Sequence, residues 1–169
     1  MKKTLLSLLI VTAIVQLLVP AYMIWDRYDV LRTGEEIKIK VEPFDPYDAF
    51  RGRYVSLDMA ETLPFDQREG MYGIFKVRED GFAVLDRVTK EKPYGELYLV
   101  SENEHYFYFP LNRYYMEETL APMAEAKLSE EKEAYVTVRI KGDKSVLSGL
   151  YIDGKPAQEL LSEINEQEN

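Results

Sequence analysis

The sequence predicts a mostly β (α+β) protein, in which an N-terminal transmembrane helix precedes an antiparallel β-sandwich or barrel-like domain with one helix. An uncharged run over residues 4–25 predicts the transmembrane helix. Six or more later segments alternate hydrophobic and polar residues, as half-buried strands do. Residues 116–131 are rich in Glu, Ala, Met and Leu, and form the long helical pattern of the domain.

The apolar run from Thr4 to Trp25 is long enough to cross a bilayer. At about 1.5 Å per residue, a helix of this length covers a hydrocarbon core of about 30 Å. Tyr22 and Trp25 lie at its end, where aromatic rings favour the headgroup layer. Two lysines precede the run and all 30 acidic residues follow it. The positive-inside rule therefore predicts a single-pass cell-membrane protein with a cytoplasmic N-terminus and an extracytoplasmic domain.

A cleaved signal peptide is the alternative interpretation of the same segment. Ala21 offers a small residue for cleavage, after Val19 and Pro20. The apolar run continues through Trp25, however, which is longer than an ordinary signal-peptide core and favours an uncleaved anchor. Both interpretations place the domain outside the cytoplasm.

The composition excludes several kinds of site. The formal net charge of −9 argues against nucleic acid as a partner, because phosphate binding needs a basic surface. The absence of Cys excludes disulfides, cysteine zinc sites and thiol catalysis. A single histidine, His105, rules out a multi-histidine metal site within one chain. We therefore predict neither a metal nor a cofactor.

The chain divides into three regions. Residues 1–33 are predicted to form the membrane anchor and a juxtamembrane helix, which Gly34 ends. Residues 34–156 are predicted to form the β-rich domain, and residues 157–169 an acidic C-terminal tail in which residues 157–164 form at most a frayed helix.

Strands are predicted from alternation and from turn residues. Ile37, Ile39 and Val41 share one face of a strand over residues 35–41, and the Asp80-Gly81 pair predicts a hairpin between residues 71–79 and 82–89. Residues 96–100 are predicted to pair with residues 105–109. Residues 53–59, 133–141 and 145–152 also alternate.

The first candidate site lies in the loop and strand of residues 42–59. Asp45, Asp48 and Arg51 bring opposite charges together beside Gly52 and Tyr54. Because a guanidinium suits carboxylates and phosphates, the segment is a candidate pocket for an anionic or sugar-like ligand. The alternative is structural: an aspartate accepts turn N–H groups and pairs with Arg51, which pins the loop against the next strand.

The second candidate site is the run Arg113, Tyr114 and Tyr115, just before the helical pattern. These side chains are candidates to line a groove, and the alternative is that they cap and cover the start of the helix. Because both candidate sites place Arg beside Tyr at a strand end, we predict that they form one contiguous binding surface.

The segment DPYDAFRGRYVSLDM resembles the defining region of the bacterial GDYXXLXY family. Gly52, Tyr54 and Leu57 match fixed positions of that motif, whereas Arg53 stands in place of Asp and Met59 in place of Tyr.

The N-terminal apolar run and the stretches NRYYMEE and LYIDGKP also resemble this family, so the resemblance covers nearly the whole chain. The resemblance implies a small membrane-anchored protein of uncharacterised function, whose relatives are often encoded beside polytopic membrane proteins. It implies no particular chemistry.

A membrane-anchored extracytoplasmic binding or interaction module is the function that these observations favour. Such a module would act as the partner of a membrane protein or as the sensor of an envelope ligand. The sequence contains no nucleophile elbow and no Gly-rich phosphate loop, so we favour a non-enzyme. The alternative is a cell-envelope hydrolase that uses the carboxylates of the DPYDAFRGRY segment.

Overall fold

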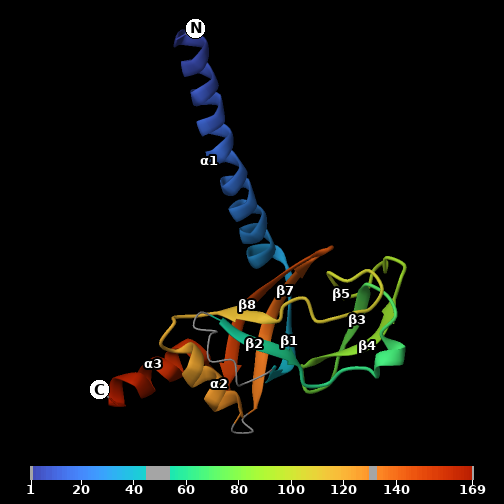
Figure 1. Cartoon of the computed structure of the whole chain (residues 1–169). Helices are drawn as coiled ribbons and strands as arrows, with labels where there is room; N and C mark the ends of the chain where they lie inside the picture. The colour runs from blue at the N-terminus through green and yellow to red at the C-terminus, as the bar shows by residue number, and fades with distance from the viewer. Residues whose placement is uncertain (1, 45–53, 130–132, 169) are drawn as a thin grey trace.

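The computed structural model describes residues 2–44, 54–129 and 133–168 of the 169-residue chain (Figure 1). A long N-terminal apolar helix leads into two antiparallel sheets with two further helices, so the predicted mostly β fold with an N-terminal helix is confirmed. The elements are α1 (Lys2–Thr33), β1 (Glu35–Pro43), β2 (Tyr54–Met59), the 3-10 helix η1 (Phe65–Gln67), β3 (Tyr72–Val77), β4 (Ala83–Thr89), β5 (Tyr98–Val100), β6 (Arg113–Tyr115), α2 (Ala121–Ser129), β7 (Ala134–Lys141), β8 (Lys144–Ile152), β9 (Lys155–Pro156) and α3 (Ala157–Glu168).

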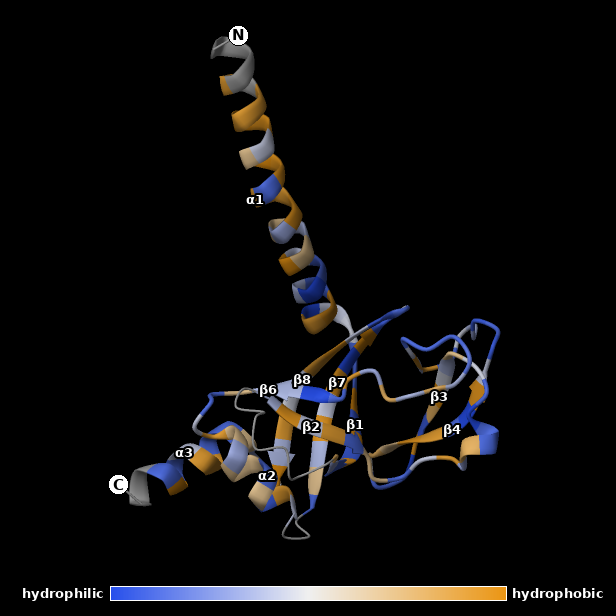
Figure 2. Cartoon of the chain, viewed as in Figure 1, coloured by the Kyte–Doolittle hydropathy of each residue, from blue (hydrophilic) through white to orange (hydrophobic). Residues whose placement is uncertain are grey.

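Helix α1 projects from the domain and is long and apolar enough over Leu8–Thr33 to cross a membrane. Its most apolar window is not covered by any other part of the described chain. Figure 2 shows hydrophobic residues around most of the projecting part and hydrophilic ones where the helix meets the sheet. A helix that is hydrophobic on all sides needs an apolar surrounding, which a bilayer supplies.

The junction between α1 and β1 is a single residue, Gly34. Its N–H donates to the Val30 carbonyl oxygen at 2.8 Å, which closes the last turn of the helix. A Cβ at this position would lie 2.5 Å from the Val30 oxygen and 3.0 Å from the Ile140 oxygen. Glycine is therefore required by close backbone approach, and it confirms the predicted helix stop.

The larger sheet has the strand order β6-β2-β1-β7-β8-β9 and curls into a half-barrel. The predicted alternation holds in its central strands: Ile37, Ile39 and Val41 of β1 are buried, as are Val55 and Leu57 of β2. Helices α2 and α3 pack against this sheet and against each other, and they supply further residues to its core.

The smaller sheet has the order β4-β3-β5. The predicted Asp80-Gly81 hairpin joins β3 to β4, and Gly81 takes the left-handed backbone that such a turn needs, with φ of 84°. Phe82, at this turn, meets Tyr135 of β7 edge to face, with ring centroids 5.4 Å apart. The two sheets share one continuous hydrophobic core.

The prediction that residues 105–109 pair with β5 is wrong. The Ser101 hydroxyl oxygen accepts hydrogen bonds from the N–H groups of Asn103 and Tyr108, so this side chain takes over bonds that a strand ladder would use. The segment bonds instead to residues 68–70, where Phe107 N–H donates to the Arg68 carbonyl oxygen at 2.8 Å. The predicted alternation of buried and exposed side chains still holds in this segment, although it forms no strand with β5: Phe107 is buried and Tyr108 is exposed.

The described part of the domain contains two α-helices where the sequence predicted one. The helix predicted over residues 116–131 begins only at Ala121, which places Pro122 in the first turn, where a missing N–H is tolerated. Residues 157–168, predicted as a tail with at most a frayed helix, form helix α3 with Ala157 and Leu161 fully buried. The burial of one apolar stripe fixes this helix despite its acidic composition.

Candidate binding surface

Strands β2 and β6 bring Tyr54, the one residue of the first candidate site that the structure describes, beside the second candidate site. In the antiparallel pair, Tyr54 lies opposite Tyr115 and Ser56 lies opposite Arg113. Residues directly opposite each other share a face of the sheet, and this face is the one turned away from buried Val55. We call Tyr54, Arg113 and Tyr115 the Arg113 surface.

The Arg113 surface is a cation held among aromatic rings. The Arg113 guanidinium carbon lies 5.2 Å from the centroid of the Tyr54 ring, a cation–π contact. The Tyr54 and Tyr115 rings are tilted by 56° with centroids 5.6 Å apart, and Tyr115 is 64% exposed. Within the described part of the chain, the Arg113 side chain makes no hydrogen bond and no ion pair. An exposed guanidinium that is held in place by a ring can donate hydrogen bonds to the oxygens of a carboxylate or a phosphate.

Tyr114 plays a different part from its two neighbours. It lies opposite Val55, packs against the core as a half-buried residue, and its hydroxyl group lies near the backbone of Leu150 in β8. Burial raises the pKa of the Tyr114 hydroxyl group above its ordinary value. Tyr114 therefore ties the β6 edge across the inside of the curled sheet and is not part of the exposed surface.

The structure does not place every predicted site residue. Asp45, Asp48, Arg51 and Gly52 lie outside the described residues, so their roles stay predictions. The alternative that residues 113–115 cap the start of a helix is wrong, because these residues form strand β6 and helix α2 begins at Ala121.

A shallow hollow of about 330 Å³ lies next to the Arg113 surface. It is lined by residues 101–103, residues 108–110 and Asn112. Asn112 is the neighbour of Arg113 in the chain, but Arg113 does not line the hollow. The Arg113 surface itself lies on the outer face of the short edge strand β6 and of its neighbour β2. This placement suits contact with a protein partner better than enclosure of a small molecule.

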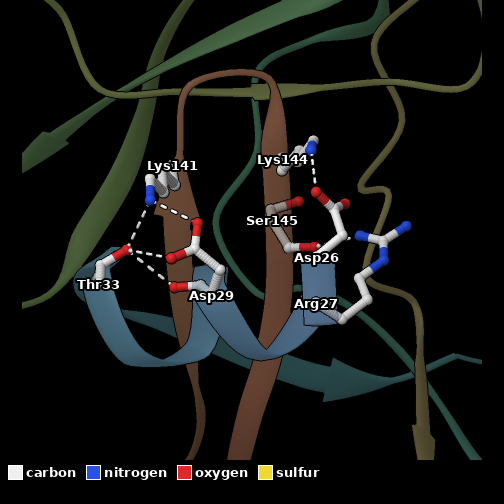
Figure 3. Close-up of polar contacts among 7 residues, drawn as sticks. All are labelled: Asp26, Arg27, Asp29, Thr33, Lys141, Lys144 and Ser145. Atoms are coloured by element: carbon white, nitrogen blue, oxygen red, sulfur yellow. Dashed lines mark hydrogen bonds and ion pairs between the residues drawn. The ribbon is translucent and has the colours of Figure 1, made fainter. Parts of the chain in front are cut away.

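A second polar cluster, which the sequence did not predict, connects α1 to the tip of the β7–β8 hairpin (Figure 3). Lys141 Nζ lies 2.5 Å from Asp29 Oδ2 and donates to Thr33 Oγ1 at 2.8 Å. Lys144 forms an ion pair with Asp26 on the preceding turn of the helix. The signal in the sequence was acids directly after the apolar run and lysines on both sides of a Gly-Asp turn, but the partners are 112 and 118 residues apart.

The same hairpin tip is joined to the smaller sheet through Asp143. Lys92 Nζ lies 2.5 Å from Asp143 Oδ2, and the Tyr98 hydroxyl donates to Asp143 Oδ1 at 2.7 Å. We call the hairpin tip with its partners on α1 and the smaller sheet the hairpin joint. The joint connects the apolar helix to both sheets at one place.

The contribution of the hairpin joint to the stability of the fold is expected to depend on pH. Lys92, with help from Tyr98, holds the pKa of Asp143 below its ordinary value of 3.8, and Asp143 holds the pKa of Lys92 above 10.5. A lowered acid pKa stabilises the fold above pH 3.8, and this contribution is lost as the pH falls through the lowered pKa. The raised lysine pKa stabilises below pH 10.5, and this contribution is lost as the pH rises through the raised pKa.

We therefore expect Asp143→Asn to lose less stability than the unchanged protein when the pH falls from about 6 to about 3. Chemical denaturation of the full chain in detergent at the two pH values measures the difference. Asp66→Asn is the matched control, because Asp66 lies in η1 at an exposed position. Equal pH dependence of both variants would show that Asp143 forms no such pair.

Comparison with known proteins matches one family over most of the chain. The family described as GDYXXLXY protein matches residues 16–150, which include the second half of α1, the smaller sheet, helix α2 and the larger sheet except for β9 and the end of β8. No curated protein matches the chain, and no solved structure matches it.

Proposed function

Since the chain belongs to the GDYXXLXY family, we propose that it is a membrane-anchored extracytoplasmic binding module whose Arg113 surface binds a membrane-protein partner. One observation carries the proposal: an exposed guanidinium is stacked on Tyr54 beside exposed Tyr115, with no acidic partner among the described residues. Arg and Tyr are enriched where interfaces gain most of their binding energy.

The chemistry of the surface favours an acidic group on the partner. The chain has 21 basic and 30 acidic residues, and in the ion pairs among the described residues the acidic side chains face lysines and arginines other than Arg113. A carboxylate from a partner would give Arg113 a bidentate pair beside two rings that exclude water.

The location of the domain is part of the proposal. An apolar helix long enough to span a bilayer, two lysines before it and the acidic residues after it support a single-pass anchor with the domain outside the cytoplasm. A partner in the same membrane would meet this domain in two dimensions, which raises its effective concentration. The resemblance to relatives that are often encoded beside polytopic membrane proteins supports the same kind of partner.

A cysteine scan tests the proposal, because the chain has no natural Cys. Glu117→Cys places an exposed thiol two residues beyond the Arg113 surface. A membrane-impermeant maleimide that carries a photo-crosslinker should label this variant on intact spheroplasts and crosslink it to a membrane protein. Adding Arg113→Ala should reduce the crosslinked product at least severalfold while leaving the thermal midpoint nearly unchanged.

Two controls sharpen the result. Glu163→Cys, exposed on α3, should be labelled equally but give no product that depends on Arg113. Arg113→Lys keeps the charge without the planar fork and should restore only part of the crosslinking. Labelling only after lysis would show that the orientation is wrong. Crosslinking that does not change with Arg113→Ala would show that this surface is not the binding site.

A further inference from the structure

The connection between β4 and β5 carries Tyr94, the most exposed large hydrophobic side chain among the described residues. Tyr94 is 98% exposed, although it lies between Pro93 and Gly95 in a turn with no ring or hydroxyl contact to another described residue. Gly95 has φ of 72°, and a Cβ there would meet nothing within 4 Å. The turn therefore presents its ring to the surroundings of the protein.

The hairpin joint fixes where this turn lies. Lys92, two residues before Tyr94, is paired with Asp143 at the tip of the β7–β8 hairpin. Lys144, the next residue of that tip, is paired with Asp26, which directly follows Trp25 in α1. Figure 1 shows the hairpin tip on the side of the domain from which α1 projects.

The distance from the apolar run is short. Asp26 and Asp29 lie within one helical turn, about 5 Å, of the last apolar residues before them. The polar layer on each side of a hydrocarbon core is about 5–8 Å thick. With α1 in a bilayer, the hairpin tip therefore lies at the depth of the lipid headgroups.

The aromatic residues at the end of α1 lie at the same level. Tyr22, Trp25 and Tyr28 are all exposed, and they follow one another at intervals of three residues. Tyrosine and tryptophan favour the headgroup layer, because their rings are apolar at one end and polar at the other. Tyr94 is also exposed, and it lies two residues from Lys92, which the hairpin tip links to the end of α1 through Asp143 and Lys144.

We propose that the turn of residues 92–95 inserts Tyr94 into the headgroup layer of the membrane that holds α1. The domain then contacts the lipid surface at two places, the helix and the turn, and the pair of Lys92 and Asp143 keeps the turn at the right depth. This inference rests on the proposed membrane anchor.

A fluorescent label at position 94 tests it. Full-length Tyr94→Cys, carrying an environment-sensitive fluorophore, is reconstituted in vesicles of phosphatidylethanolamine and phosphatidylglycerol with nitroxide-labelled headgroups. We expect severalfold stronger quenching than for the same fluorophore on Glu163→Cys, which is exposed on α3. Asp143→Asn in the labelled background should lower the quenching at position 94, because the turn loses its tie to the joint.

Trp25 is the single tryptophan of the chain and reports separately on the anchor. Quenching of Trp25 without quenching at position 94 would overturn the contact of the turn and leave the anchor standing. Loss of quenching at both positions would overturn the anchor and the turn together. If the cysteine at position 94 is shielded from a water-soluble thiol reagent in native membranes but not in lipid vesicles, the proposal is also overturned. The turn would then contact a protein partner and not the lipid.

Discussion

Phe107→Ala is expected to lower the free energy of unfolding by about 3–5 kcal/mol, among the largest effects of any single substitution in this chain. Phe107 is 1% exposed, and its ring meets Phe75 edge to face with centroids 6.3 Å apart. The ring also fills the space above Gly73, where a Cβ would lie 2.5 Å from two of its atoms. Removal of the ring leaves a cavity between the smaller sheet and the segment that covers it.

Chemical denaturation of the full chain in detergent measures this effect. Tyr108→Ala is the matched control, since Tyr108 is the next residue, is aromatic and is 49% exposed. We expect it to change stability by about 0.5 kcal/mol. Gly73→Ala should be far less harmful in the Phe107→Ala background than alone, because the cavity accepts the added methyl group. Equal losses for Phe107→Ala and Tyr108→Ala would contradict the packing described above.

Leu161→Ala is expected to lower the free energy of unfolding by about 2–5 kcal/mol. Leu161 is fully buried in α3, which packs against α2 and β8. The same region was predicted from its acidic composition to be a tail, for which such a substitution would have no effect.

Truncation after Pro156 provides the second measurement of α3. Deletion of the helix should destabilise the domain at least as much as Leu161→Ala, because it uncovers the same part of the core. Glu163→Ala, at an exposed position of the same helix, is the control and should change stability by about 0.5 kcal/mol or less. A truncated protein of unchanged stability would mean that α3 does not belong to the folded unit.

Local pattern was sufficient for the strands that bury one face. In β1, β2 and β7, hydrophobic residues alternate with polar ones because one side of the sheet faces the core, and that side is visible in the sequence. The segment of residues 105–109 shows the limit of this argument. Its alternation reflects burial, whereas its hydrogen bonds depend on Ser101 and on residues 68–70, which no periodicity reveals.

Contacts between distant segments could not be predicted in the same way. The pairing of β1 with β7 and the ion pairs of the hairpin joint link residues that are about a hundred positions apart in the chain. The adjacency of Tyr54 and Arg113 was predicted from shared composition at strand ends, and the pairing of β2 with β6 supplies the physical reason for it. The inward direction of Tyr114 follows from strand parity once that register is known.

The single-residue junction at Gly34 has a mechanical consequence. Strand β1 begins directly after α1, close backbone contacts exclude any side chain at the junction, and ion pairs hold the end of the helix against the hairpin tip. The domain is therefore joined directly to α1, without a flexible linker between them. Any rotation or tilt of α1 within a bilayer would turn the whole sheet by the same angle. Rotation of α1 about its own axis would then move the Arg113 surface at one constant height above the bilayer, whereas a tilt of α1 would change that height.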